Sequence, residues 1–326
     1  MKELNIAIVI SLSQNHVHYC KALIASIEYF NPLTPIIILK DGVFNTSSID
    51  GRRNISVINT KHINTFHQLD LEFLLTKLNI FFLPQLGFNY DYFIHIDADS
   101  VLTNPFDFKM FSNEIYDFFI FQGEKISYHN EKQQKQICHY AFDPSNFPEY
   151  SFNLEQLYFF SSSHICIHKR IFPLLLSYLE IHRFEINKVL LKNKRIRFND
   201  QGFLNLVINV LSNSNKINVK LNNCGIYGKE QSSKYPLLTI ENIKSKINTN
   251  VMFIHYTGPS RKVNLKSHNY GYILKYFVKR FYKNNSLHYH TSESIRKIKY
   301  YYKWVRKRVK LKLINLFKKI LLHIKK

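Results

Sequence analysis

The stretch Tyr92-Phe93-Ile94-His95-Ile96-Asp97-Ala98-Asp99-Ser100-Val101-Leu102 decides the fold. Its first part is rich in β-branched and aromatic residues, which predicts a buried strand of a parallel sheet. Alternate side chains of an extended segment point the same way, so Asp97 and Asp99 can face one ligand beyond the strand's carboxyl end. Open α/β sheets bind ligands at that edge, and paired carboxylates suit Mg²⁺ or Mn²⁺ with a phosphate-bearing substrate.

Plain turn chemistry is the alternative for this acidic pair. Thr103-Asn104-Pro105 follows closely, and Asn-Pro is typical of turns. Solvated or helix-capping aspartates would then explain the pattern without any ligand. The rest of the chain has to decide between the two interpretations.

The composition predicts a folded protein with an anionic partner. At 326 residues and 45% apolar content, the chain can bury one large core or two modest ones. The formal net charge is +22, and residues 296–326 contain thirteen Lys or Arg and no Asp or Glu. Such a positive field indicates nucleic acid, acidic lipid or phosphorylated small molecules as partners.

The cysteines and apolar runs indicate a cytoplasmic protein. Cys20, Cys138, Cys166 and Cys224 form no C-x-x-C pair, so we expect free thiols in a reducing compartment. The apolar run at residues 6–10 is too short for a signal peptide. No apolar run approaches the roughly 20 residues that span a bilayer.

The amino-terminal third alternates strands and helices. We predict strands at residues 4–10, 35–39 and 55–58, and a helix at 19–29 that stops before Asn31-Pro32. This order is typical of a doubly wound sheet. Residues 11–15 are expected to form a polar loop, and residues 69–83 have helical periodicity.

Polar residues follow the first two predicted strands. Ser11, Ser13, Gln14 and Asp41 stand where such sheets hold a nucleotide base and ribose. Turn formation is the alternative role for each of them.

Four stretches in order resemble the motifs of the family 8 glycosyltransferases, which have the GT-A fold. The first is residues 83–105, which contains the D-x-D sequence. The others are Phe160–Ile167, which resembles the strand beside the sugar site, Phe198–Asn205, which resembles an Asp-Gln element at a helix start, and Ile254–Arg261, which resembles an H-x-x-G-x-x-K signature.

The resemblance implies a fold class and a domain plan. It predicts an α/β protein with a Rossmann-like, doubly wound mixed sheet of the GT-A type over residues 1–262. Residues 1–105 would form the nucleotide-binding half, and residues 106–262 the sugar and acceptor half. A connector at residues 263–290 would lead to a carboxyl-terminal helix at 291–326.

The resemblance also assigns roles to residues. Asp97, Asp99 and His255 would bind Mn²⁺ or Mg²⁺, and one imidazole among oxygen ligands favours Mn²⁺. The remaining donor-binding positions are Lys77, which is a candidate substitute for the family's Arg, Ala98, Gly258, Arg261 and Lys262. For His255, the alternative is a buried structural histidine.

Two further residues are predicted to act at the transferred sugar. Asp200 would hold donor hydroxyls and Gln201 would lie beneath the anomeric carbon, although Asp200 could instead be an N-cap. The family retains anomeric configuration. Because a neutral Gln is a poor nucleophile, we expect front-face displacement in which the leaving diphosphate takes the acceptor's proton. This sequence has Ser162-Ser163-His164 where the family usually has Asn-Ser-Gly.

The carboxyl-terminal segment 291–326 predicts a basic amphipathic helix. Its apolar residues recur in steps of three and four, at Ile298, Tyr302, Val305, Val309, Leu313, Leu316, Ile320 and Ile324. Lys and Arg fill the other faces, which is typical of a helix in a membrane interface with anionic lipid. A helix packed on the catalytic domain and an RNA-binding arm are the alternatives.

Together these features predict a metal-dependent glycosyltransferase. It would move a sugar from a nucleotide-sugar, UDP-hexose by preference, to a glycan or lipid-linked glycan. We expect it to serve lipopolysaccharide or capsule synthesis, peripherally on the inner face of the cytoplasmic membrane and without nucleic acid. The alternatives are a haloacid dehalogenase-like phosphatase, whose first motif also reads Asp-x-Asp after a strand, and a non-catalytic basic protein that binds membrane or nucleic acid.

Overall fold

A computed structural model describes residues 4–63, 73–111, 116–182, 200–257 and 270–282, together with residues 294, 302 and 306. The strands of the main sheet are β1 (Ile6–Ser13), β2 (Ile36–Asp41), β3 (Ile55–Asn59), β4 (Tyr92–Asp97), β6 (Phe118–Ile120), β9 (His164–His168) and β10 (Val219–Leu221). Two smaller sheets contain β5 (Ser100–Leu102), β7 (Gly123–Ile126), β8 (Leu157–Phe160), β11 (Gly225–Tyr227) and β12 (Phe253–His255).

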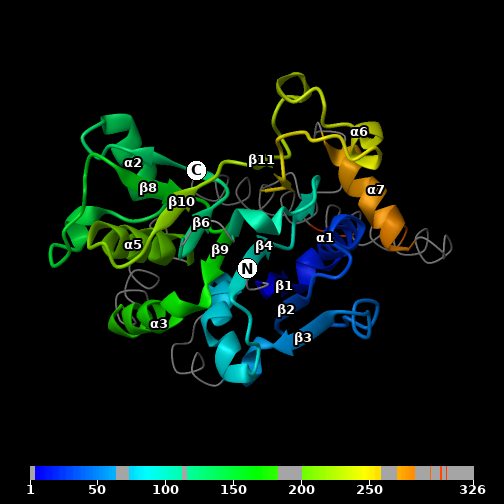
Figure 1. Cartoon of the computed structure of the whole chain (residues 1–326), viewed down its shortest axis with the longest axis horizontal. Coiled ribbons are helices and arrows are strands. Elements are labelled where there is room, and N and C mark those ends of the chain that lie inside the picture. The colour runs from blue at the N-terminus through cyan, green and yellow to red at the C-terminus, as the bar shows by residue number, and fades with distance from the viewer. Residues whose placement is uncertain are drawn as a thin grey trace, which may run out of the picture.

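Helices connect and cover these strands (Figure 1). The α-helices are α1 (Val17–Phe30), α2 (Glu131–Tyr140), α3 (Phe172–Ile181), α5 (Asp200–Asn213), α6 (Ile240–Lys244) and α7 (Gly271–Phe281). A long 3₁₀ helix, η4, runs from Phe73 to Leu86. Short 3₁₀ turns are η1 (Gln14–His16), η2 (Thr60–His62), η5 (Phe108–Phe111), η6 (Pro144–Asn146), η7 (Lys169–Ile171) and η8 (Ser232–Lys234).

The seven-stranded sheet has the order β10-β6-β9-β4-β1-β2-β3. Strand β1 pairs in parallel with β2 and β4, and β2 pairs in parallel with β3. Strand β9 runs antiparallel to both of its neighbours, β4 and β6. The sheet is therefore mixed and doubly wound, as predicted, and it continues without a break across the predicted boundary at residue 105.

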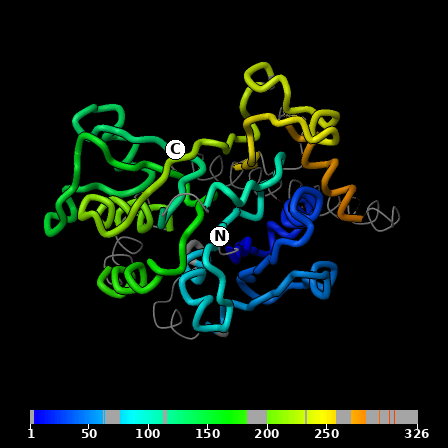
Figure 2. The backbone as a smooth tube through the Cα atoms, viewed as in Figure 1, coloured from blue at the N-terminus to red at the C-terminus, as the bar shows by residue number. Residues whose placement is uncertain are grey.

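Both faces of the sheet are buried because helices cover each of them. Ile8 and Ile10 of β1 face the core shared with α1 and α7, whereas Ala7 and Val9 face the core shared with η4, α3 and α5. Each fully buried Leu or Ile contributes about 1.5–3 kcal/mol. The backbone passes from β1–β3 to the group α2, α3 and α5, then returns to pack α7 beside α1 (Figure 2).

Two predicted elements differ from the structure. The loop predicted at residues 11–15 is wrong for its first part, because Ser11 and Ser13 pair with Leu39 and Asp41 and so extend β1. The helical pattern predicted at 69–83 falls partly outside the described residues, and the described part is a 3₁₀ helix that runs on past Pro84. Gly87 follows with a φ of 88°, a conformation that glycine adopts without strain.

Two antiparallel pairings assemble the candidate site. Strand β12 pairs with β5 so that His255 lies opposite Ser100, immediately after the D-x-D turn. The amide of Tyr256 donates to the carbonyl of Asp99 at 2.9 Å. On the other side, the Asp97 amide donates to the Ser163 carbonyl at 2.9 Å. Segments distant in the sequence therefore meet at the carboxyl end of β4.

The carboxyl-terminal helix predicted at 291–326 lies outside the described residues, apart from residues 294, 302 and 306. Within the described ranges, no helix combines the length and the apolar character that a bilayer crossing needs. All four cysteine thiols are free.

Candidate functional site

The first part of the site, which we call the acidic corner, consists of Asp97, Asp99 and His255. Nε2 of His255 lies 3.3 Å from Oδ1 of Asp99 and 3.7 Å from Oδ2 of Asp97. One ligand atom from each residue lies within 4.8 Å of the others. Asp99 and His255 are buried, whereas the Asp97 side chain is 23% exposed. The corner is therefore open to a ligand on the Asp97 side only.

This donor set fits a divalent cation. Both ring nitrogens of His255 are buried and have no hydrogen-bond partner among the described residues. A buried imidazole nitrogen without a partner is costly, and a metal ion would satisfy it. Two carboxylates with one imidazole form a set that accepts Mn²⁺, Mg²⁺ or a later first-row ion. The geometry thus brings together the three residues predicted as metal ligands.

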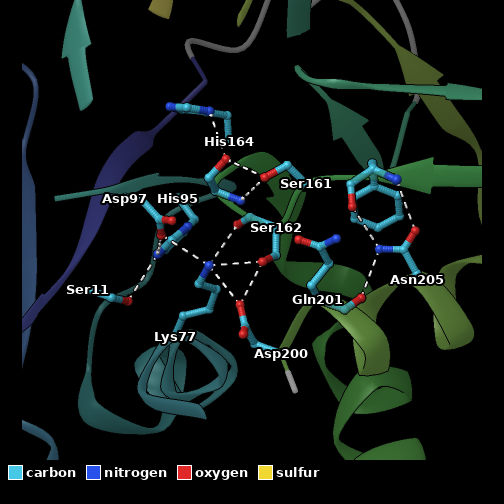
Figure 3. A network of polar contacts seen from close by, with 12 residues as sticks. Ser11, Lys77, His95, Asp97, Ser161, Ser162, His164, Asp200, Gln201 and Asn205 are labelled. Carbon is cyan, nitrogen blue, oxygen red and sulfur yellow. Dashed lines mark hydrogen bonds and ion pairs between the residues drawn. The ribbon is translucent and has the colours of Figure 1, made fainter. Parts of the chain in front are cut away.

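The second part, the lysine corner, consists of Lys77, Ser162 and Asp200 (Figure 3). Nζ of Lys77 lies 2.7 Å from Oδ2 of Asp200 and 3.1 Å from Oδ1 of Asp97. The same ammonium donates to Oγ of Ser162 at 3.0 Å and to its carbonyl at 3.3 Å. The Ser162 hydroxyl donates in turn to Oδ2 of Asp200 at 2.6 Å. Asp97 is the residue that joins the two corners.

The charges of this network are held in place by their partners. Burial alone would lower the pKa of Lys77, but the carboxylates of Asp200 and Asp97 outweigh it and hold that pKa well above its usual value. Burial would likewise raise the pKa of Asp97, but Lys77 and the neighbouring imidazoles keep it well below its usual range. Lys77 and Asp97 are therefore a charged pair at neutral pH.

Helix α5 positions Asp200, its first residue. Asn205, one turn later on α5, exchanges two hydrogen bonds with the backbone of Phe160, at 3.0 and 2.9 Å. Asn209 does the same with Tyr158. These two amides fix α5 against β8, and the turn after β8 carries Ser162. The Asp200 carboxylate accepts from Lys77 and Ser162, so the N-cap alternative does not account for the contacts of this residue.

Two buried histidines support the acidic corner. Nε2 of His95 lies 3.0 Å from the Ser11 hydroxyl, and burial followed by the charge of Lys77 lowers the pKa of His95 to about 3. His164 contacts the hydroxyls of Ser100 and Ser163 at 2.9 and 3.1 Å, and burial lowers its pKa well below the usual value. Both rings are therefore neutral at pH 7.

His164 also orients the imidazole of His255. The two rings meet edge to face with centroids 5.2 Å apart, and His164 stacks on Phe253. On the other side, the ring of Tyr227 stacks on His255 at 5.9 Å. A Cβ atom at Gly228 would lie 2.7 Å from the Tyr256 ring, so this turn needs a glycine.

The structure does not bring every predicted site residue into this network. Ser13 and Asp41 lie opposite each other at the carboxyl ends of β1 and β2, and the Ser13 hydroxyl contacts Nδ1 of His16 at 2.9 Å. Burial raises the pKa of Asp41. Ser11 lies on the same edge and contacts His95. These positions are compatible with the predicted nucleotide side of the site.

The other predicted residues fall into two groups. Ala98 is buried between the two aspartates, and Nε2 of Gln201 donates to the carbonyl of Tyr140 at 3.1 Å. Gly258, Arg261 and Lys262 lie outside the described residues, so their roles stay predictions.

Sequence reasoning missed His95 as part of the site, and it placed the segment of Ser162 and His164 beside the sugar site by motif resemblance without predicting their contacts. His95 stands two positions before Asp97 on the same strand, and the period of a strand could have placed both on one side. Ser162 and His164 depend on the antiparallel register of β9 against β4, which no local pattern reveals.

Comparisons with known proteins agree on the fold. No protein-family model matches the chain, and no curated protein sequence matches it. The solved structure of WbbM, a bifunctional glycosyltransferase, superposes with a TM-score of 0.51 at 15% identity over 86% of this chain. This chain covers 52% of WbbM, about half of its length. The likeness confirms the predicted α/β fold of the GT-A type.

Two other solved structures are similar at slightly lower scores. The galactosyltransferase LgtC, solved with donor and acceptor sugar analogues, has 14% identity and a TM-score of 0.49 over 83% of this chain and 95% of its own. The glycosyltransferase GlyE of Streptococcus pneumoniae has 11% identity and a TM-score of 0.46 over 84% of this chain and 60% of its own.

Proposed function

We propose that this protein is a metal-dependent glycosyltransferase that moves a sugar from a nucleotide-sugar to a glycan or glycolipid acceptor. The observation that carries the proposal is the meeting of Asp97, Asp99 and His255 at the carboxyl edge of a GT-A sheet. Ligands bind at this edge in open α/β sheets. The fold favours this activity over the phosphatase and the non-catalytic alternatives.

The acidic corner would hold the divalent ion, for which we propose Mn²⁺. When bound, the ion would neutralise the charge that develops on the leaving diphosphate. His95 and His164 contribute no charge of their own at neutral pH and keep the carboxylates and His255 oriented. Arg261 and Lys262 are proposed as further phosphate contacts from the sequence motif alone.

The lysine corner would bind the donor sugar. The described contacts of Asp200 use Oδ2, which leaves Oδ1 to accept hydrogen bonds from sugar hydroxyls. Lys77 fixes the Asp200 carboxylate relative to Asp97, so the sugar and its diphosphate are held in one geometry. The side chain of Gln201, the next residue of α5, extends into the same region in Figure 3.

The reaction is proposed to retain anomeric configuration. Gln201 is a neutral amide and a poor nucleophile, which argues against a covalent intermediate on that residue. In the proposed front-face displacement, the bond from the anomeric carbon to the diphosphate oxygen breaks as the acceptor oxygen attacks from the same side. The acceptor's proton passes to the departing diphosphate. An α-linked donor would therefore give an α-linked product, which proton NMR of the anomeric signal can read.

The proposals for the donor, the pathway and the membrane association rest on the sequence. A UDP-hexose donor and a role in lipopolysaccharide or capsule synthesis follow from the family resemblance. Association with the inner face of the cytoplasmic membrane follows from the basic amphipathic pattern at 291–326. An acceptor held on lipid would explain why a sugar transferase carries such a tail.

Slow hydrolysis of nucleotide-sugars tests the proposal without knowledge of the acceptor. The purified chain is incubated with Mn²⁺ and a panel of UDP-, GDP- and CMP-sugars, and released sugar is measured. We expect hydrolysis of one donor class, its loss on chelation, and its return when Mn²⁺ is restored. Hydrolysis that is unchanged by chelation, or absent for the whole panel, would refute the assignment.

A further inference from the structure

The outer side of α6 and α7, together with the end of α1, gathers basic and aromatic side chains. We call this surface the basic face, and it consists of Tyr29, Lys244, Lys246, Tyr272, Lys275, Tyr276, Lys279 and Arg280. The three helices lie at one end of the molecule, and α2, α3 and α5 lie at the other (Figure 1). The basic face thus lies at the opposite end of the molecule from α2, α3 and α5 (Figure 1).

The periodicity of α7 separates this face from the core. Its apolar side chains pack inward against α1, and they are Ile273, Leu274, Phe277, Val278 and Phe281. Its outward positions are Tyr272, Lys275, Tyr276, Lys279 and Arg280. Those five recur in steps of three and four and therefore share one side of the helix. No acidic residue interrupts them.

Aromatic rings hold several of these cations in place. The Arg280 guanidinium lies 4.4 Å above the centroid of Tyr29, and the Lys246 ammonium lies 6.0 Å from the same ring. Lys244 lies 5.7 Å from the Tyr276 ring. Such contacts offset part of the repulsion between neighbouring like charges. These contacts therefore keep the positive charges close together on the basic face.

The charge balance of this segment is strongly positive. Residues 240–247 and 271–281 carry five cations, whereas Glu241 is their sole carboxylate. Glu28 of α1 is paired with Arg52 at 2.7 Å and so does not neutralise the face. An anionic partner is the natural complement.

Apolar side chains beside the cations distinguish a lipid surface from a nucleic acid. Leu237, Ile247 and Tyr272 are 50%, 43% and 39% exposed, and they lie in or next to the same elements. Tyr272 is anchored by a hydrogen bond from its hydroxyl to the Leu238 carbonyl at 2.7 Å. Nucleic-acid phosphates bind cations but do not bind exposed aliphatic groups, whereas a bilayer interface accepts cations and apolar groups together.

We propose that the basic face docks on an anionic lipid bilayer. Lysine and arginine of α6 and α7 contact lipid headgroups, and Tyr272, Ile247 and Leu237 enter the interface. Helix α7 ends at Phe281, and the chain that follows includes the thirteen cations of residues 296–326. The folded domain and residues 296–326 would then contact the same membrane. Sugar hydrolysis in solution needs no membrane, so this proposal and the proposed function can fail separately.

Vesicle cosedimentation of the full chain tests the proposal with a matched pair of variants. The test variant is Lys275→Glu/Lys279→Glu on α7, and the control is Lys132→Glu/Lys135→Glu on α2. Both exchange two exposed helical lysines, give the same net charge and leave the tail intact. On vesicles of phosphatidylglycerol and phosphatidylcholine, we expect the test variant to partition at least about thirtyfold more weakly than the control.

Three outcomes would overturn the proposal. Equal binding by the two variants would assign membrane binding to the tail alone. Absence of wild-type binding to anionic vesicles would show that an anionic bilayer is not the partner of the basic face. Loss of binding to single-stranded RNA with unchanged vesicle binding would make the face a nucleic-acid surface.

Single-tryptophan fluorescence tests the geometry directly. Trp304 is the only tryptophan in the chain, so Trp304→Phe provides a silent background. In that background, Tyr272→Trp is expected to shift its emission to the blue and to be quenched by brominated lipid in anionic vesicles. Tyr140→Trp, at an exposed position of α2, should do neither. Quenching of both reporters, or of neither, contradicts docking through the basic face.

Discussion

The two corners of the site handle buried negative charge in opposite ways. In the lysine corner, the ammonium of Lys77 sits 2.7 Å from Asp200 and neutralises it within the chain. In the acidic corner, Asp97 and Asp99 face the imidazole of His255, and the two imidazoles nearby are held neutral by burial. One corner is complete as folded, whereas the other has a donor set that calls for an external cation.

This difference assigns separate tasks to neighbouring carboxylates. A carboxylate that is paired with an internal lysine is fixed in position and can orient a neutral ligand. Two carboxylates that converge with an imidazole on one point supply the oxygen and nitrogen ligands that a divalent ion needs. Asp97 belongs to both corners, because its Oδ1 contacts Lys77 and its Oδ2 contacts His255. Substitutions that affect only one corner should therefore separate ion binding from stability.

The largest expected effect comes from the acidic corner. Asp99→Asn removes one charge and one oxygen ligand, and we expect metal-dependent nucleotide-sugar hydrolysis to fall by about 100-fold or more. The folded state should persist, as measured by circular dichroism. Asp107→Asn, an exposed aspartate beyond β5, serves as the control and should keep full activity. Comparable activity in the two variants would mean that the acidic corner has no catalytic role.

Lys77→Met tests the other corner. It leaves Asp200 and Asp97 without their cation, and we expect the free energy of unfolding in chelator to fall by about 3–5 kcal/mol. The double variant Lys77→Met/Asp200→Asn should recover much of that loss, because it also removes the buried charge. Urea unfolding measures both. A cost under about 1 kcal/mol for Lys77→Met would show that solvent already screens these carboxylates.

The neutral state of His95 gives a pH dependence. Its pKa is about 3 in the folded protein and near 6.5 when unfolded, so unfolding takes up a proton at acidic pH. Its stabilising effect is complete above pH 6.5 and is lost as pH falls towards 3. In metal-free wild-type protein, we expect the protonation of His95 on unfolding to lower the free energy of unfolding by ~3 kcal/mol between pH 7 and pH 4. His95→Gln should not show this decrease.

Urea unfolding at several pH values measures this difference. His129→Gln, at an exposed position of the loop before α2, is the control and should leave the acid limb unchanged. An acid limb that is equally steep in His95→Gln would mean that this imidazole already carries a proton in the folded state.

The smallest effect is expected at Ser162. Ser162→Ala removes a hydroxyl that accepts from Lys77 and donates to Asp200, at a cost of about 1–2 kcal/mol. Ser161→Ala, in the same turn, loses contacts with the uncharged groups of Ser163 and Tyr227 and should cost less. Equal losses of stability for the two serine variants would mean that the Ser162 hydroxyl does not stabilise the lysine corner.

Local patterns predicted the parts of this molecule that depend on local physics. The apolar run before Asp97 predicted β4, and Asn31-Pro32 predicted the end of α1. The extension of β1 through Ser11 and Ser13 was missed because polar residues usually end strands, whereas pairing with β2 held them in the sheet. The 3₁₀ form of η4 was also missed, since its apolar spacing resembles that of an α-helix.

Non-local pairing decided the remaining part of the site. His255 was selected by motif resemblance, and its place beside Asp99 depends on the pairing of β12 with β5. Ser162 and His164 reach the site through the register of β9 against β4. Strand registers between distant segments are set by the whole core, so no window of sequence contains them.

Titration of the purified chain with Mn²⁺, followed by the electron paramagnetic resonance signal of the free ion, tests the central claim most directly. We predict one bound Mn²⁺ per chain, tighter binding in the presence of a nucleoside diphosphate, and at least about tenfold weaker binding in His255→Ala. Lys77→Arg, which keeps the charge of the lysine corner, should bind the ion as the wild type does. Equal Mn²⁺ affinity in the wild type and in His255→Ala would contradict the account.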